Sequence, residues 1–109
     1  MLKRHVPSGI RSFLYAPANR ARELAEAFDS TADAVVLDLE HSVAVADKDA
    51  ARRHAVEALR RPRGMKGYVH INAFPTRYCI ADLDAVIGRW LDGVVLPKAE
   101  VPEALQVVA

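Results

Sequence analysis

The segment from residue 34 to residue 41 constrains the fold of this chain more than any other. It reads A-V-V-L-D-L-E-H. Its apolar, β-branched start predicts a strand buried on both faces, as parallel strands beneath helices are. Charged groups are costly inside a core, so Asp38, Glu40 and His41 belong at the carboxyl end of that strand. Ligands of parallel α/β folds bind at this end, which predicts one strand of a barrel enzyme carrying its acid/base groups.

Apolar patterns along the rest of the chain predict a regular alternation of strands and helices. Strands are expected at residues 11–16, 34–39, 67–72 and 93–96, and helices at 21–28, 47–59, 80–90 and from Pro102 onward. Such alternation indicates an α/β protein with a mainly parallel sheet and right-handed crossovers. Periodicity alone leaves two architectures open, an open doubly wound sheet and part of a (β/α)₈ barrel.

Composition narrows the class of protein. The 109 residues are 51% hydrophobic and carry a net charge of +1, so we expect a single globular domain at 1–109 that binds neither nucleic acid nor a membrane. The lone cysteine, Cys79, excludes an internal disulfide and favours a cytoplasmic location. Dinucleotide, phosphate-loop and serine-nucleophile motifs are absent from the sequence, which argues against those chemistries.

Topology decides which charged residues can reach a site at the carboxyl ends of the strands. Segments that run from strand to helix lie at that end. They carry Arg20, Asp38, Glu40, His41 and Lys98. A basic cluster runs from residue 60 to residue 66 (Arg60, Arg61, Arg63 and Lys66) and falls at the opposite end, where a solvated turn is the expected role.

Asp38 and His41 are the candidate acid/base pair. Their spacing of three residues at a strand end would let the carboxylate accept a hydrogen bond from one imidazole nitrogen and leave the other free as a base. In the alternative interpretation, Asp38 caps the loop and His41 is merely exposed. Spacing alone does not choose between these two roles.

Four further side chains have both a functional and a structural interpretation. Glu40 is a candidate catalytic group that could ligate a metal or hold a water molecule beside one, or else the ion-pair partner of Lys98 or Arg20. His70, in the third strand, points into the sheet interior as a site residue or as a satisfied core histidine. Lys98 and Arg20 are candidate ligands for a substrate anion, or else surface ion-pair residues.

Several segments together resemble the amino-terminal part of the HpcH/HpaI aldolase and citrate lyase beta-subunit family. They are R-S-F-L-Y-A-P-A-N-R (11–20), A-D-A-V-V-L-D-L-E-H-S-V (32–43), A-D-K-D-A-A-R (46–52), V-H-I-N (69–72) and G-V-V-L-P-K-A-E (93–100). The resemblance covers nearly the whole chain. It implies a (β/α)₈ barrel, Mg²⁺ or another divalent cation, and aldol or Claisen cleavage of a carbon–carbon bond. The implied substrates are acyl-CoA thioesters such as citryl-CoA or malyl-CoA, or hydroxy-keto acids.

The chain departs from the family pattern at two positions. The citrate lyase branch usually reads D-L-E-D where this chain has D-L-E-H, and the aldolase branch uses an Asp and a His at this spacing as its acid/base pair. The resemblance therefore implies roles for Asp38, Glu40 and His41 in catalysis. His70 stands where the family has a substrate-binding Arg, and an imidazole lacks the bidentate fork of a guanidinium.

The family's metal carboxylates lie on strands beyond the fourth, so we expect no metal ligand within residues 1–109. A full barrel needs about 250 residues, and this length suits about four βα units, the amino-terminal half. A half-barrel exposes sheet edges and its apolar interior, which favours a homo-oligomer or a complementing chain. The competing hypotheses are thus a carbon–carbon lyase, a non-catalytic half-barrel that folds only with a partner, and an open α/β binding module.

Overall fold

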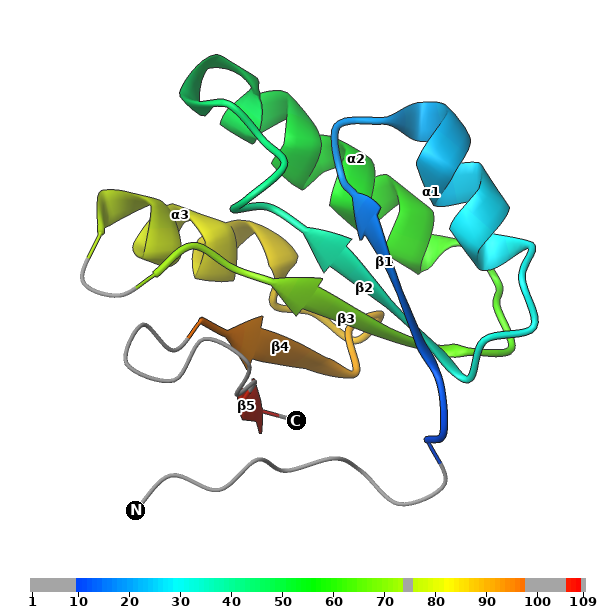
Figure 1. The fold of residues 1–109 in the computed structure, drawn as a ribbon. Coiled ribbons are helices and arrows are strands. Elements are labelled where there is room, and N and C mark those ends of the chain that lie inside the picture. Colours follow the sequence, from blue (N-terminus) through cyan, green and yellow to red (C-terminus); the bar gives the residue numbers. More distant parts are fainter. Residues whose placement is uncertain (1–9, 74–75, 98–105, 109) are drawn as a thin grey trace.

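The computed structural model describes residues 10–73, 76–97 and 106–108, and they alternate between strands and helices as predicted (Figure 1). The elements in chain order are β1 (Phe13–Pro17), α1 (Ala21–Phe28), β2 (Ala34–Asp38), the 3₁₀ helix η1 (Val45–Asp47), α2 (Lys48–Arg60), β3 (Lys66–His70), α3 (Arg77–Val86), β4 (Gly93–Leu96) and β5 (Gln106–Val108).

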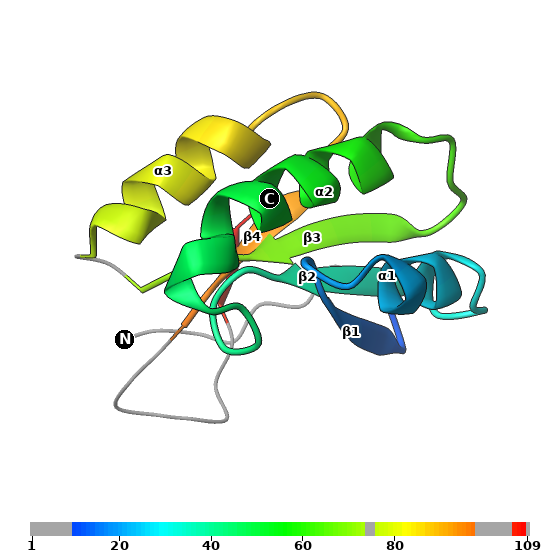
Figure 2. The same ribbon diagram turned by 90° about the horizontal axis from the view of Figure 1, so that it is seen from above.

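The sheet has the sequential strand order β1-β2-β3-β4-β5, and its first four strands are parallel. Helices α1, α2 and α3 lie on one face of it (Figure 2). A doubly wound sheet would instead reverse its strand order and carry helices on both faces. The described fold is therefore that of the amino-terminal half of a (β/α)₈ barrel, and the open-sheet alternative is wrong.

The two faces of the sheet bury different side chains. Alternate residues such as Val35, Leu37 and Val69 point toward the helices and form the larger core with them. The opposite face carries a smaller apolar cluster of Val36, Tyr68, Val95 and Ala34. In a barrel this second face is the interior, so residues that continue its alternation at the strand ends point into the mouth of the barrel.

The C-terminal segment corrects one prediction. Residues 106–108 form β5, which pairs antiparallel with β4, where a helix starting at Pro102 was expected. Pro102 itself lies outside the described residues. Val107 and Val108 are β-branched and suit a strand, and the free edge of β4 offers them ladder hydrogen bonds. These tertiary partners outweigh a helix-start signal that rested on one proline.

Helix α3 is shorter than its apolar spacing suggested. It ends at Val86, and Ile87 already has extended backbone angles (φ −65°, ψ 123°). Trp90 folds back over Gly88, where a Cβ would overlap the indole. Its ring also lies beside the Arg60 guanidinium, 5.1 Å from ring centroid to Cζ. An aromatic residue that fitted the helical stripe is thus used to cover the turn after the helix.

Part of the basic cluster is buried, contrary to the expected solvated turn. The Arg63 side chain is only 14% exposed and donates to the Met65 carbonyl (2.7 Å) and to the Asp92 carboxylate (3.0 Å). Asp92 also accepts a hydrogen bond from the Gly67 backbone (2.8 Å). Arg63 therefore ties the α2–β3 turn to the segment before β4, at the amino ends of the strands.

We expect Asp92→Asn to lower the free energy of unfolding by about 1–3 kcal/mol at pH 7, because the hydrogen bonds of Asp92 involve a charged group. Burial would raise the pKa of Asp92, but the hydrogen bonds from Gly67 and Arg63 and the charges of Arg63 and Lys66 together hold it below its ordinary value. A carboxyl with a lowered pKa in the folded state stabilises above its unfolded pKa and loses this contribution as the pH falls through the folded pKa.

Urea unfolding at several pH values checks this expectation. The difference between wild type and Asp92→Asn should shrink below about pH 4. The exposed Asp84 supplies the control, and Asp84→Asn should change little at any pH. A difference for Asp92→Asn that stays constant from pH 7 to pH 3 would contradict the assigned charge interaction.

Candidate active site

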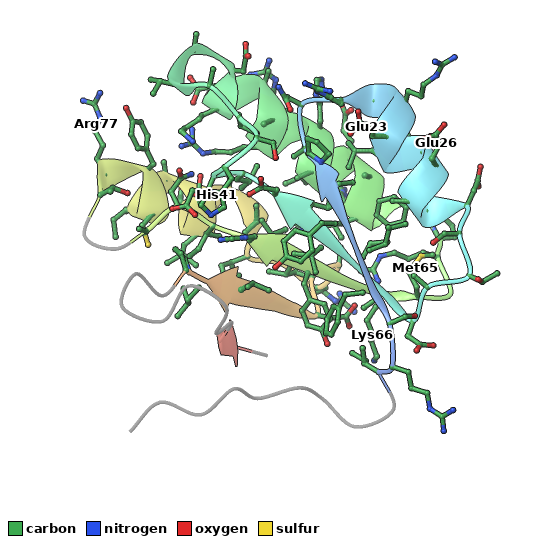
Figure 3. All side chains as sticks on the ribbon, in the orientation of Figure 1. Glu23, Glu26, His41, Met65, Lys66 and Arg77 are labelled. Atoms are coloured by element: carbon green, nitrogen blue, oxygen red, sulfur yellow. The ribbon has the colours of Figure 1, made fainter. Side chains whose placement is uncertain are left out.

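The polar side chains predicted for the carboxyl ends of the strands meet in the structure. Asp38 ends β2 and His70 ends β3, and the two are register partners in the parallel sheet. Both continue the alternation of Val36 and Tyr68, so they point to the face away from the helices. Glu40 and His41 follow on the loop after β2, and Figure 3 labels His41 at the carboxyl ends of the strands, far from Lys66.

Asp38 organises the loop that follows β2. Its Oδ1 accepts hydrogen bonds from the backbone of Glu40 (2.9 Å) and His41 (3.3 Å), and its Oδ2 accepts from the Ser42 backbone (2.9 Å) and hydroxyl (2.6 Å). Burial alone would raise the pKa of Asp38, but these hydrogen bonds from Ser42 and Glu40, with the nearby His70, bring it below its ordinary value. Asp38 is therefore an ionised carboxylate that caps the loop.

The expected hydrogen bond between Asp38 and the His41 imidazole is not found among the described residues. The His41 ring turns instead toward Glu40, with 3.1 Å between His41 Nε2 and Glu40 Oε1. The same Glu40 oxygen lies 3.2 Å from His70 Nε2. Because Asp38 already accepts several N–H and O–H groups from its own loop, its lone pairs are engaged. The carboxylate between the two imidazoles is therefore Glu40.

His70 is buried at the centre of this group. Its side chain is 5% exposed, and its Nδ1 lies 3.9 Å from Asp38 Oδ1. Its ring meets those of Tyr15 and His41 edge-on, at centroid distances of 6.0 and 5.4 Å. Burial, with the nearby His41, lowers the pKa of His70 against the opposing effect of Asp38 and Glu40. His70 is thus neutral at pH 7, with a lone pair available on one ring nitrogen.

Glu40, His41 and His70 can hold a metal ion. One ligand atom from each lies within 4.8 Å of the others. This grouping differs from the expectation of no metal ligand within residues 1–109, which rested on the family's later carboxylates, although Glu40 by itself was a candidate ligand. The usable signal was the pair Glu40-His41 at the end of one strand with a histidine at the end of the next.

The two remaining candidate residues do not join this group in the described structure. Arg20 pairs with Glu23 in the exposed first turn of α1, at 3.2 Å, and among the described residues no ion pair or hydrogen bond links it to Glu40. Lys98 lies outside the described residues. The expected pairing of Glu40 with Arg20 is therefore not observed, and the two imidazoles take its place.

A buried polar network, which was not predicted from the sequence, lies beneath the loop. Lys48 Nζ donates to the backbone carbonyls of Leu39 (3.0 Å) and Val43 (3.2 Å) and to Asn72 Oδ1 (2.8 Å). The Asn72 side chain donates in turn to Asp82 Oδ2 (2.6 Å). Lys48 thereby holds both ends of the loop that carries Glu40 and His41.

The network continues to the outer helices. Arg52 Nε donates to Asp82 Oδ1 (2.7 Å), and the Asp82 side chain is fully buried. Asp82 stands between Cys79 and Val86 on the buried stripe of α3. A carboxylate within an apolar stripe was the sequence signal for this network, since such a group must be paired.

One cavity of about 330 Å³ lies away from this group, between α1 and α2. It is lined by Leu24, Phe28, His54, Glu57 and Arg61 among others, and none of the strand-end residues reaches it. The candidate site is thus defined by converging polar atoms rather than by this hollow.

Within the described ranges, every helix is too short or too polar to cross a membrane.

Comparison with known proteins places the chain in a family. The model of the HpcH/HpaI aldolase/citrate lyase family matches residues 11–109. The chain belongs to this family. The resemblance inferred from the sequence motifs is confirmed, and members of the HpcH/HpaI family among its relatives are lyases or related enzymes.

Individual relatives cover most of the chain but a smaller part of their own length. The citrate lyase subunit beta of Escherichia coli (strain K12) is 39% identical over 92 residues, which is 83% of this chain and 30% of that protein. The (3S)-malyl-CoA thioesterase of Cereibacter sphaeroides (strain KD131 / KCTC 12085) is 33% identical over 107 residues, 96% of this chain and 38% of that protein. The chain thus spans about a third of the length of these curated relatives.

A solved structure shows the same fold. CitE from Mycobacterium tuberculosis, in complex with magnesium, acetoacetate and coenzyme A, matches with a TM-score of 0.70 at 39% identity. The match covers 84% of this chain and 34% of that chain. The HpcH/HpaI family fold therefore extends over most of residues 1–109.

Proposed function

We propose that this chain supplies acid/base and substrate-binding groups of a divalent-cation-dependent carbon–carbon lyase. The substrate would be an acyl-CoA thioester of the citryl-CoA or malyl-CoA type, or a hydroxy-keto acid. The observation that carries the proposal is the convergence of Asp38, Glu40, His41 and His70 at the carboxyl ends of adjacent parallel strands. Family membership supports the reaction class, and relatives named as citrate lyase and malyl-CoA enzymes support the substrate class.

Cleavage of a β-hydroxy thioester needs one group that takes a proton and returns it. The base removes the hydroxyl proton, the C–O bond becomes a carbonyl, and the electrons of the breaking C–C bond form an enolate that is then protonated. We assign the proton transfer to His41 Nδ1, because Nε2 faces Glu40 and the side chain is 75% exposed to an incoming substrate. Glu40 stabilises the imidazolium, and Asp38 fixes the loop that carries both residues.

The chain's own donor set does not match Mg²⁺. Magnesium prefers an octahedral shell of oxygen atoms, whereas Glu40, His41 and His70 offer one carboxylate and two imidazoles. The proposal therefore places the carboxylate ligands for Mg²⁺ beyond residue 109. When bound, the ion supplies Lewis-acid stabilisation of the enolate.

The proposed substrate-binding groups are His70, Arg20 and Lys98. His70, being neutral, contributes a hydrogen bond rather than a charge to a substrate carboxylate or carbonyl. Arg20 and Lys98 follow strands β1 and β4 and supply the cationic charge. Their targets are the free carboxylate of the substrate or the phosphates of coenzyme A.

A product assay tests the lyase proposal. The protein that contains this chain is incubated with malyl-CoA, citryl-CoA and a 4-hydroxy-2-keto acid, and keto-acid products and free CoA thiol are measured separately. We expect release of glyoxylate, oxaloacetate or pyruvate from one substrate class, abolished by a chelator and restored by Mg²⁺. Thiol release without a keto-acid product would indicate hydrolysis alone and contradict the proposal, as would cleavage insensitive to the chelator.

A second candidate is a non-catalytic half-barrel that is stable only with another chain. The observation that favours it is the apolar edge strand β1, where Phe13, Leu14 and Tyr15 are 37%, 39% and 43% exposed. An exposed apolar edge invites pairing with another strand. Under this function the same assay gives no keto-acid product, and sedimentation gives a species heavier than one chain.

A further inference from the structure

The group at the strand ends holds polar atoms that the folded chain leaves without hydrogen bonds. Glu40 Oε1 and both ring nitrogens of His70 are buried and have no directed hydrogen bond among the described residues. The His70 side chain is only 5% exposed, and its Nε2 lies 3.2 Å from Glu40 Oε1 without the geometry of a hydrogen bond. Buried polar atoms are normally paired, so such an orphaned set points to a missing ligand.

The spacing and chemistry of these atoms fit a metal ion. Glu40 Oε1 lies 3.1 Å from His41 Nε2 and 3.2 Å from His70 Nε2. Two ligands bonded to one zinc ion at about 2.0–2.1 Å in tetrahedral geometry lie roughly 3.3 Å apart. The two distances from Glu40 Oε1 to the imidazole nitrogens are close to that value.

We propose that Glu40, His41 and His70 form a binding site for a divalent transition metal ion, of which Zn²⁺ is the representative. Two imidazoles and one carboxylate suit zinc, cobalt or nickel better than magnesium. The three residues supply three ligands to the ion, so a fourth coordination position stays open for water or substrate. The exposed His41 has the freedom to close on the ion, whereas His70 and Glu40 are held by β3 and by the capped loop.

Asp38 lies beside the His70 nitrogen that faces away from the proposed metal ion. A metal-bound histidine usually directs its second nitrogen toward a carboxylate, which fixes the ring and raises its basicity. In this chain His70 Nε2 faces the cluster while His70 Nδ1 lies 3.9 Å from Asp38 Oδ1. This separation is longer than a hydrogen bond, and the Asp38 oxygens are engaged by the loop, so Asp38 acts on the His70 ring through its charge.

This site shares Glu40, His41 and His70 with the proposed lyase site but binds a different ion, because the Mg²⁺ of the lyase reaction is assigned to ligands beyond residue 109. Its test therefore uses metal binding and not turnover. The full 109-residue chain, freed of metal by chelation, is titrated with Zn²⁺ by calorimetry and with Co²⁺ by visible absorption. We expect saturable binding of one ion per chain, with the intense d–d bands of a four- or five-coordinate cobalt site.

Substitutions locate the ion. Glu40→Gln, His70→Gln and His41→Asn should each weaken Zn²⁺ binding by at least about tenfold. His54→Asn, on exposed helix surface, is the matched histidine control and should leave the affinity unchanged. Binding should also release protons and strengthen from pH 6 to pH 8, because the ion competes with protons for the imidazoles.

His41→Asn protects the test against misfolding, since this side chain is 75% exposed and its loss should leave the thermal transition of the metal-free chain unchanged. Equal Zn²⁺ affinity in the three cluster variants and in the control would overturn the proposal. So would displacement of Zn²⁺ by an equal concentration of Mg²⁺, or loss of binding in His54→Asn alone. Zinc binding without lyase activity would leave this site standing and remove only the proposed function.

Discussion

Replacement of Asp82 by alanine is expected to lower the free energy of unfolding by about 3–5 kcal/mol, because it removes the buried partner of Arg52 and leaves that cation only the solvent-exposed Asp49 carboxylate. Asp82 is fully buried and accepts a hydrogen bond from Arg52 Nε at 2.7 Å. It also accepts from the backbone (2.7 Å) and the side chain (2.6 Å) of Asn72. All these donors would lose an acceptor at once in a region that water does not reach.

Urea denaturation at pH 7 measures this loss. Asp84→Ala on the exposed side of the same helix is the matched control and should stay within about 0.5 kcal/mol of wild type. The double variant Arg52→Met/Asp82→Leu should recover part of the stability, because an apolar pair leaves no uncompensated charge. A loss below about 1 kcal/mol for Asp82→Ala would show that the pair adds little and contradict the expectation.

Loss of the His41 imidazole is expected to lower kcat by about 10²- to 10⁴-fold in the protein that contains this chain, the usual contribution of a general acid/base group. The ring is 75% exposed and contacts Glu40 rather than the core, so His41→Asn should fold normally. KM should change much less than kcat, because the proposed role is proton transfer in the transition state.

Steady-state kinetics of lyase product formation check this prediction, with His54→Asn as the histidine control. Glu40→Gln should lower kcat less than His41→Asn does, since it removes the stabilisation of the imidazolium and keeps the base. Full activity of His41→Asn would refute the acid/base role. Equal losses of kcat in His41→Asn and His54→Asn would also refute it, because the effect would not be specific to the site.

Much of the fold follows from local patterns. The apolar run before Asp38 and the alternation of the other segments predict the parallel strands and three helices. A strand buried on both faces gives a continuous apolar run, whereas a helix buried along one stripe gives apolar residues at a spacing of three to four. Strand order and the one-sided placement of the helices are tertiary features, so the barrel could only be preferred by resemblance. The β5 strand was not predicted because its pairing with β4 stabilises it, and this tertiary contact cannot be inferred from the local sequence of β5.

The sequence predicted which residues lie at the candidate site, but not which of them contact one another. Topology alone brings Asp38, His41 and His70 to one end of the sheet, because parallel strands share a carboxyl edge. Which carboxylate meets which imidazole depends on the loop path. The loop's own N–H groups turn toward Asp38, and this leaves Glu40 to lie between the rings. Sequence spacing carries no information on that competition.

Lys48, a residue of α2, positions Glu40 and His41 without contacting either side chain. Its ammonium group donates hydrogen bonds to the carbonyls of Leu39 and Val43, and so fixes the loop between them to the first turn of α2. Any exchange at position 48 that shortened this reach would let Glu40 and His41 drift away from His70. A substitution at residue 48 would then change both turnover and metal affinity. Evolution could adjust the two properties without replacing a residue in the mouth of the barrel.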